Sequence, residues 1–158
     1  MTSDFKWDGQ FWTDSITLPF QSESVQIRIY AENDSIKPTQ RQREVCKLIS
    51  TYLRGIKTQL DEHAATYCRA VDAAVDLAQE NVSIDYDAIS AHWTVSCVVI
   101  GKLENCKGNY FFLSCGCDWE LEHGMEFLLD GREIIFCSGH TIAFLAADTD
   151  DSYHSFGS

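Results

Sequence analysis

The sequence predicts an α+β fold, in which an N-terminal β-hairpin and a two-helix pair precede an antiparallel β-meander that forms one sheet packed on the helices. Three observations support this class. Apolar residues alternate with polar ones near both ends of the chain, they recur at helical spacing in between, and the two patterns do not interleave. A length of 158 residues is that of one domain, so we assign residues 1–158 to a single unit with an aromatic lead-in over 1–14 and an acidic, polar tail over 148–158.

The first strands are predicted from alternation on either side of a polar connection. Ile16 and Leu18 flank a threonine, and a second alternating stretch occupies residues 25–29, after a polar segment at residues 21–24. This pattern predicts a hairpin with one buried face. The aromatic residues of the lead-in are Phe5, Trp7, Phe11 and Trp12. Such residues either anchor an interface or cover the open end of a core, and cover is the commoner role.

Two helices are expected next. Thr39 followed by Gln42 fits a capping box, in which the hydroxyl accepts the N3 amide hydrogen and the glutamine reaches back. The apolar positions that follow at helical spacing are Val45, Leu48, Ile49, Tyr52, Leu53 and Ile56. Gly55 is expected to end this helix, and Thr58 to cap a second one. The buried stripe of the second helix is expected to be Ala64, Cys68, Val71, Val75 and Ala78.

The C-terminal half is predicted to be the meander. Residues 93–100 and 110–119 read as strands, and the odd-numbered residues of the second stretch share one face because side chains alternate along a strand. A helical turn is expected near residues 87–89, before the first of these strands. Residues 141–146 are expected to add a last short strand.

The last hairpin has the clearest local signal. Asp130-Gly131 between two apolar stretches is typical of a two-residue turn. Counting outward from that turn pairs Leu129 with Arg132 on a side that is expected to be buried. The opposite side, which carries Leu128, is expected to face solvent or an interface.

Composition excludes several classes of protein. The apolar share of 45% and the charged share of 23% are those of a soluble globular chain, and no apolar run approaches the roughly 20 residues that a membrane span needs. A net charge of −12 repels phosphate backbones, so neither nucleic acid nor an anionic membrane is an expected partner. Seven cysteines, an odd number, and an N-terminus without a secretory pattern favour reduced thiols and a cytoplasmic location.

The negative charge is confined to the second part of the chain. Nine acidic and nine basic residues precede Ala70, whereas fifteen acidic and three basic residues follow from there to the end. The densest clusters are residues 118–126 and 148–151. Such a surface either keeps the chain soluble or steers a basic partner toward it.

The segment most able to carry chemistry is residues 115–124. Cys115, Cys117 and His123 could converge on zinc, and a fourth ligand would come from Cys137 or His140. Two thiols on one face of a straight strand lie roughly 7 Å apart, which makes core packing the more common role of such a pair. We therefore expect no cofactor and no resident metal, with the metal site kept as an alternative.

The same segment offers two catalytic interpretations and one structural one. Glu122 and His123 could act in acid–base catalysis, but adjacent side chains of an extended chain point in opposite directions. Cys137 with His140 could form a nucleophile–base pair, although no local signature supports it. The favoured interpretation is a tight turn at residues 122–124, in which Gly124 adopts a positive φ. We expect the protein not to be an enzyme.

The segment Trp-Glu-Leu-Glu-His-Gly-Met-Glu at residues 119–126, followed by Asp130-Gly131, resembles an uncharacterised bacterial domain family. Its members carry a Cys/Trp-x-x-Glu-His-Gly segment before their last two strands. Two upstream features are also similar, a Leu-Pro hairpin at residues 18–19 and a Pro-Thr-x-Arg-Gln helix start at residues 38–42. The likeness covers about residues 11–140. It implies a cytosolic α+β protein of the kind found as candidate immunity proteins, encoded beside secreted bacterial toxins.

The resulting functional prediction is a non-catalytic immunity protein that binds and neutralises a cognate toxin. The toxin is expected to be a basic effector such as a nuclease, because carboxylates can take the place of phosphates in its active site or substrate groove. The predicted contact residues are Asp118, Trp119, Glu120, Glu122, Glu126, Asp148, Asp150, Asp151 and Tyr153. The alternatives are a metal- or small-ligand module centred on the Cys-Gly-Cys…Glu-His-Gly segment, and a housekeeping interaction protein whose acidic surface serves solubility alone.

Overall fold

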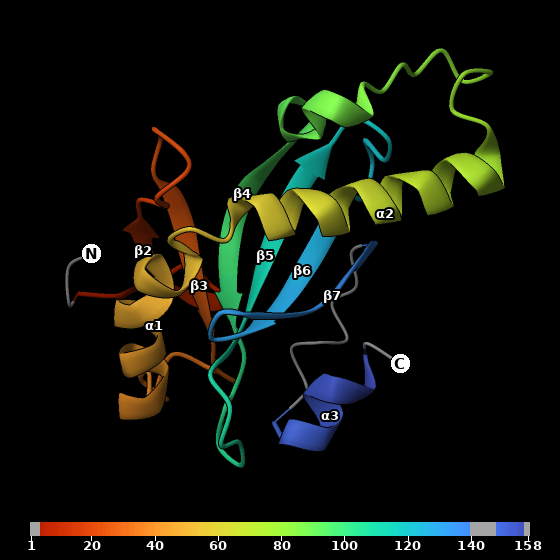
Figure 1. The fold of residues 1–158 in the computed structure, drawn as a ribbon. Helices are drawn as coiled ribbons and strands as arrows, with labels where there is room; N and C mark the ends of the chain where they lie inside the picture. Colours follow the sequence, from red (N-terminus) through yellow and green to blue (C-terminus); the bar gives the residue numbers. More distant parts are fainter. Residues whose placement is uncertain (1–3, 140–147, 157–158) are drawn as a thin grey trace.

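A single mixed sheet organises the chain, and a computed structural model describes it over residues 4–139 and 148–156. Seven strands follow one another in sequence order across the sheet. Every neighbouring pair is antiparallel except β3 and β4, which are parallel. The segment between these two strands forms two helices and a short 3-10 helix (Figure 1). The predicted α+β class is confirmed, and the parallel pair is a feature that the sequence pattern did not indicate.

Three strands form the N-terminal part of the sheet. They are β1 (Lys6–Trp7), β2 (Phe11–Ile16) and β3 (Val25–Tyr30). The predicted hairpin exists, but its first strand starts at Phe11, so the lead-in is ordered strand rather than a loose segment. Trp12 is 6% exposed and donates its indole N–H to the carbonyl of Ile36 at 2.8 Å, while Trp7 packs against it. These aromatic residues cover the core, as the commoner of the two interpretations predicts.

Helix α1 (Gln40–Leu53) begins as the sequence predicts. The hydroxyl of Thr39 accepts the amide hydrogen of Gln42, and the Gln42 side chain accepts the amide hydrogen of Thr39. The buried Gln42 amide also donates to two carbonyls, Tyr30 O at 3.2 Å and Gly101 O at 2.7 Å. The capping glutamine therefore ties the helix start to the loops that follow β3 and β4.

Helix α2 (Lys57–Val75) begins one residue before the predicted cap, with Ile56 rather than Thr58 at the N-cap. Its buried residues are Leu60, Ala64, Ala65 and Cys68. The predicted stripe does not continue to the end of the helix, since Val75 is 50% exposed. The reason is geometric, because the last turns of α2 extend past the sheet (Figure 1).

The second half of the chain continues the sheet after the 3-10 helix η1 (Tyr86–His92). Its strands are β4 (Trp93–Ile100), β5 (Tyr110–Cys117), β6 (Met125–Asp130) and β7 (Glu133–Gly139). Phe111 of β5 stacks on Tyr52 of α1 at 6.2 Å between ring centroids, so the odd-numbered residues of β5 face the helices. The expected last strand at 141–146 lies outside the described residues.

The predicted register of the last hairpin is wrong: the turn lies one residue later than expected, and Leu129 pairs with Ile134 instead of Arg132. Asp130 pairs with Glu133, and the turn is Gly131-Arg132 instead of Asp130-Gly131. The physical reason is a set of contacts outside the hairpin: Asp130 accepts the Asn109 amide hydrogen at 2.8 Å, and the Gly131 amide donates to the Asn109 carbonyl at 3.1 Å. These bonds hold Asp130 in the strand. A register shift between Leu128 and Leu129 follows one pair later.

The tail contains a helix, α3 (Asp150–Ser155), which packs on the sheet face opposite α1 and α2. Tyr153 stacks on Tyr110 at 4.3 Å and lies near Phe112 at 6.0 Å between centroids. These two rings are even-numbered residues of β5, so they point away from the helix pair. The side of the last hairpin that was expected to face solvent is accordingly buried, and Leu128 is fully inaccessible.

Candidate functional site: the acidic end of the sheet

The loop between β5 and β6 is held as a tight turn. The Gly124 amide donates to the Glu120 carbonyl at 2.9 Å, and Gly124 has a φ of +66°. A Cβ atom at this position would lie 2.1 Å from the carbonyl oxygen of Cys115, so only glycine fits. The side chain of Glu120 accepts the His123 amide hydrogen at 3.3 Å. The Glu-His-Gly segment is thus built as a turn, and it presents Leu121 outward with 82% exposure.

His92 joins this loop to η1. The Asp118 amide donates to the His92 carbonyl at 2.9 Å, and Nδ1 of His92 lies 2.8 Å from Oδ2 of Asp118. Nε2 of the same ring accepts the Asp85 amide hydrogen at 3.1 Å. Because Nε2 accepts, Nδ1 carries the hydrogen and donates it to the carboxylate. The ring therefore links the segment before η1 to the start of the β5–β6 loop.

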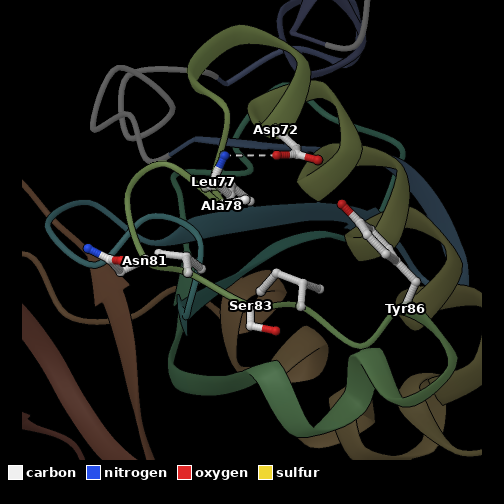
Figure 2. A pocket seen from close by; sticks show the side chains of 8 residues that line it. Asp72, Leu77, Ala78, Asn81, Ser83 and Tyr86 are labelled. Atoms are coloured by element: carbon white, nitrogen blue, oxygen red, sulfur yellow. Dashed lines mark hydrogen bonds between the residues drawn. The ribbon is translucent and has the colours of Figure 1, made fainter.

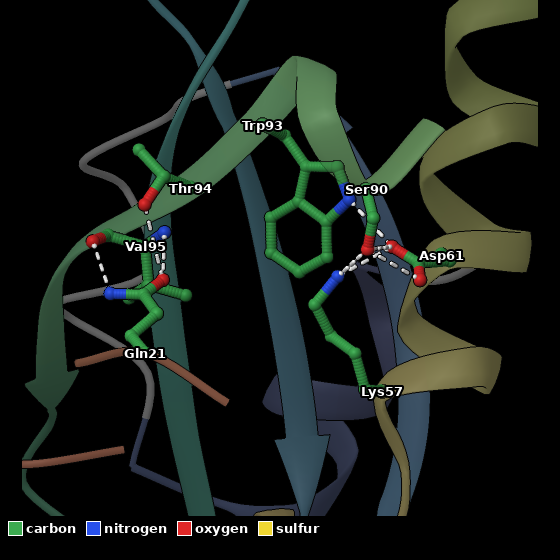
Figure 3. Close-up of polar contacts among 7 residues, drawn as sticks. All are labelled: Gln21, Lys57, Asp61, Ser90, Trp93, Thr94 and Val95. Atoms are coloured by element: carbon green, nitrogen blue, oxygen red, sulfur yellow. Dashed lines mark hydrogen bonds and ion pairs between the residues drawn. The ribbon is translucent and has the colours of Figure 1, made fainter. Parts of the chain in front are cut away.

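A polar cluster fixes η1 against α2 (Figure 3). Asp61 accepts hydrogen bonds from the indole N–H of Trp93 at 2.8 Å and from the Ser90 hydroxyl at 2.9 Å. It also forms an ion pair with Lys57 at 2.7 Å, and Lys57 contacts the Ser90 hydroxyl as well. The Lys57 ammonium lies 4.3 Å from the centroid of the Trp93 ring. The positive charge of Lys57 is thereby neutralised by an ion pair within the protein.

Carboxylates are frequent on the last turns of α2, on the loop after it, on η1 and on the β5–β6 loop, and these segments lie toward one end of the sheet (Figure 1). We call this region the acidic end and define it as Asp72, Asp76, Glu80, Asp85, Asp87, Asp118, Glu120 and Glu122. The three basic residues of the second part of the chain lie at the opposite end of the strands. They are Lys102 and Lys107 before β5 and Arg132 in the β6–β7 turn. Acidic residues also lie at that opposite end, including Glu104, Asp130, Glu133 and the tail cluster, so the acidic end differs in carrying none of the three basic residues.

The structure brings together three of the nine predicted contact residues, Asp118, Glu120 and Glu122, all on the β5–β6 loop. Two others from the same stretch are buried. Trp119, a predicted aromatic anchor, is 4% exposed and packs against Tyr67, and its indole nitrogen has no hydrogen-bond partner within residues 4–139 and 148–156. Glu126 is 4% exposed on β6. Alternation along the strand turns Glu126 to the sheet face that α3 shares, away from the acidic end.

The remaining four predicted contact residues lie at the other end of β5, roughly 23 Å away for an eight-residue strand. Asp150 accepts hydrogen bonds from the amides of Lys107 at 3.0 Å and Gly108 at 2.9 Å, and from the Tyr110 hydroxyl at 2.7 Å. These bonds lower the pKa of Asp150 to about 2. Asp148 accepts a hydrogen bond from the Asn105 side chain, Asp151 is exposed, and Tyr153 is fully buried. The two acidic clusters do not form one patch, because Asp150 and Tyr153 hold α3 in place.

Five of the seven cysteines are buried in the core, and Cys106 and Cys137 are half-buried. Cys115 and Cys117 are 4% and 6% exposed, whereas the His123 side chain is 66% exposed and points elsewhere. Burial raises the pKa of the Cys117 thiol to about 11 and that of Cys115 well above its usual range. Over residues 4–139 and 148–156, no three His, Cys, Asp or Glu side chains are placed to hold a metal ion. His140, the other candidate ligand and catalytic base, lies outside the described residues.

A cavity of about 430 Å³ opens beneath the C-terminal end of α2, within the acidic end (Figure 2). Its lining residues are Asp72, Leu77, Ala78, Asn81, Val82, Ser83, Ile84 and Tyr86. Sequence reasoning did not include this cavity, because residues 80–91 read as an ordinary connection. The available signal was the excess of acidic residues that begins after Ala70.

Comparison with known proteins gives one match. Residues 1–144 match the family described as Domain of unknown function (DUF6985). No curated protein and no solved structure matches the chain. Within the described ranges, no helix is both long and apolar enough to cross a bilayer. The expectation of an uncharacterised domain family is confirmed, and α3 lies beyond the matched residues.

Proposed function

The chain belongs to the DUF6985 family, and from this premise we propose that it is a non-catalytic immunity protein that binds a basic toxin through the acidic end. The binding would occlude the active site or the substrate groove of the toxin. The link to immunity rests on the resemblance carried by the Trp-x-x-Glu-His-Gly segment at residues 119–124. The choice of surface rests on the arrangement of charge and exposed apolar area.

The observation that carries the proposal is the setting of Leu121. Its side chain is 82% exposed on a turn that is fixed by hydrogen bonds, and Glu120 and Glu122 flank it. Exposed apolar residues surrounded by charge are typical of protein interfaces, in which an apolar centre is rimmed by polar groups. Three other large apolar side chains are exposed in the described part of the chain, Ile36, Leu48 and Val75, and Leu121 is the most exposed of the four.

The charge of this surface determines the kind of partner. Lys57 pairs with Asp61, and Arg69, which stacks over the Tyr86 ring at 4.5 Å, contributes one positive charge against the eight carboxylates of the acidic end. The field of the acidic end is therefore not cancelled locally, and such a field increases the association rate of a basic protein by roughly 10- to 1,000-fold at low salt. A nuclease presents the complementary surface, because its groove binds a polyanion.

The state of the thiols also favours binding over catalysis. Nucleophilic cysteines have lowered pKa values in electropositive, partly exposed settings. Here burial raises the pKa of Cys46 to about 12 and that of Cys106 to about 11. These thiols, of which Cys46 is buried and Cys106 is half-buried, stay protonated and therefore weakly nucleophilic near neutral pH.

The test uses the product of the neighbouring gene as the candidate toxin and measures its association rate with this protein by stopped flow. The variant Glu80→Lys/Asp87→Lys/Glu122→Lys reverses three exposed charges at the acidic end. We expect an association rate at least about tenfold lower at low salt, with a flatter dependence on ionic strength. Growth protection by the same variant, co-expressed with the toxin, should fall in parallel.

A matched control reverses the same number of exposed charges elsewhere. The variant Glu23→Lys/Asp34→Lys/Glu133→Lys alters net charge equally but leaves the acidic end intact. Its association rate should stay within about threefold of the parent, because steering depends on local rather than total charge. Equal effects of the two triple variants, or no complex with the parent protein, would refute the proposal.

A further inference from the structure

The cavity beneath the C-terminal end of α2 has a defined frame. It is bounded by α2, by the loop over residues 76–85 and by Tyr86 of η1 (Figure 2). The loop closes on itself, since the Val82 amide donates to the Leu77 carbonyl at 2.9 Å. Asp76 and Asn81 adopt left-handed backbone conformations, with φ of +53° and +59°. A cavity of about 430 Å³ lies in the range of small-ligand sites, and a frame that is already formed lowers the ordering cost of binding.

One charged group lines the cavity, the Asp72 carboxylate. Its Oδ1 accepts the Leu77 amide hydrogen at 2.8 Å, which fixes the orientation of the group. Its Oδ2 has no hydrogen-bond partner among the residues that the structure describes. Arg69, one helical turn earlier, forms no ion pair with Asp72 within 4 Å and stacks on Tyr86 instead. The carboxylate therefore keeps one oxygen available for a cation.

The rest of the lining suits a cation that is carried on an aliphatic stem. Leu77, Val82 and Ile84 supply apolar wall, while Asn81 and Ser83 supply neutral polar groups near the rim. Lysine and arginine side chains combine a hydrocarbon stem with a charged head and are recognised by this combination. The surrounding acidic end favours the approach of the same ligand.

We propose that this cavity is a binding site for a lysine or arginine side chain that the basic partner inserts between α2 and the 76–85 loop. The identity of the donor as a protein partner rests on the proposed function. The cavity gives that partner an anchor distinct from Leu121. The head group contacts Oδ2 of Asp72, and the stem lies along Leu77 and Val82.

The test titrates the ¹⁵N-labelled full chain with N-acetyl-arginine methylamide and with N-acetyl-lysine methylamide, followed by NMR. We expect saturable shifts of the amides between residues 77 and 84 with at least one of the two probes. The citrulline analogue has the shape of arginine without its charge and should bind about fivefold more weakly. Equal binding of the citrulline analogue would overturn the proposal.

Two variants test whether the Asp72 carboxylate, rather than negative charge in general, binds the cationic probe. Asp72→Asn keeps an oxygen for the Leu77 amide but removes the charge, and we expect about fivefold weaker binding of the cationic probe. Glu133→Gln removes an exposed carboxylate that belongs neither to the cavity nor to the acidic end, and the probe should bind this variant within about twofold of the parent. Binding to Asp72→Asn at parental affinity would overturn the cation site.

The titration contains no toxin, so its outcome is independent of the proposed function. Probe binding by a protein that forms no complex with the toxin would refute the immunity proposal and leave the cation site standing. A toxin complex that Asp72→Asn and the cavity-filling variant Ala78→Trp leave unchanged would refute the anchor and leave the acidic-end interface standing.

Discussion

The stacked pair of Tyr110 and Tyr153 gives two chemically identical substitutions with opposite expected effects. The rings lie 4.3 Å apart with an interplanar angle of 12°, and the two residues are 1% and 0% exposed. The Tyr110 hydroxyl donates to the Asp150 carboxylate at 2.7 Å. The Tyr153 hydroxyl is buried and has no hydrogen-bond partner among the described residues. Removing one hydroxyl breaks a bond, whereas removing the other relieves an unsatisfied polar group.

The magnitudes follow from these environments. Tyr110→Phe loses a hydrogen bond to an ionised acceptor, which costs about 1.5 kcal/mol of unfolding free energy. Tyr153→Phe removes a buried hydroxyl whose desolvation is uncompensated, which stabilises the fold by about 1 kcal/mol. Both variants keep the ring, so stacking and buried apolar area change little.

Urea unfolding monitored by tryptophan fluorescence measures both effects, with the slope of the transition held as a check on two-state behaviour. In a thermal scan, the two variants should move the midpoint in opposite directions by about 2–4 °C per kcal/mol. A destabilised Tyr153→Phe, or a neutral Tyr110→Phe, would refute the account of how α3 is attached.

Three further outcomes are expected. Gly124→Ala should cost about 3 kcal/mol in urea unfolding, because φ is +66° and the added Cβ would lie 2.1 Å from the Cys115 carbonyl oxygen. Gly116→Ala should cost less than about 1 kcal/mol, because the nearest atom to an added Cβ is the Ser96 hydroxyl oxygen at 4.0 Å. The pKa of Asp150 is lowered from 3.8 to about 2 in the folded state, so its contribution to the free energy of unfolding is complete above about pH 4 and is lost as the pH falls toward 2. Asp150→Asn should therefore lose less unfolding free energy over that interval than the parent, and an equal loss would contradict the assignment. Because burial raises the pKa of all seven thiols, Ellman's reagent at pH 8 should label the native protein far more slowly than the urea-unfolded protein, and rapid labelling of several thiols would contradict their burial.

Local chemistry made much of the fold predictable. The capping box of Thr39 and Gln42 places the start of α1, and alternation correctly identifies which residues of β5 share a face. Neighbour relations across the sheet are not local, so the parallel pairing of β3 with β4 had no signal in the alternation. The error at the last hairpin has the same origin, since Asn109, twenty-one residues before Asp130, decides which residues form the turn.

The candidate site was only partly predictable for a related reason. Charge along the chain marked the β5–β6 loop, where Asp118, Glu120 and Glu122 lie together. It also marked the tail, where Asp150 turned out to be a ligand of backbone amides rather than a surface charge. A carboxylate that accepts hydrogen bonds from a loop and one that contacts a partner look the same in a sequence. The difference lies in backbone amides, which nearly every residue has, so it leaves no sequence signal.

The parallel contact of β3 with β4 has a consequence for how the molecule forms. Gln26 pairs with Cys97 across an interval of seventy-one residues, whereas each antiparallel neighbour is joined to the next by a short connection. The antiparallel pairs within β1–β3 and within β4–β7 can form early, because closing their short connections costs little entropy. Strands β3 and β4 can pair only after the helices between them have folded and brought the two parts together. The β3–β4 pair in the middle of the sheet is therefore expected to form last. Agents that slow the docking of α1 and α2 should populate a state in which the β1–β3 and β4–β7 parts are folded and the edges of β3 and β4 are unpaired.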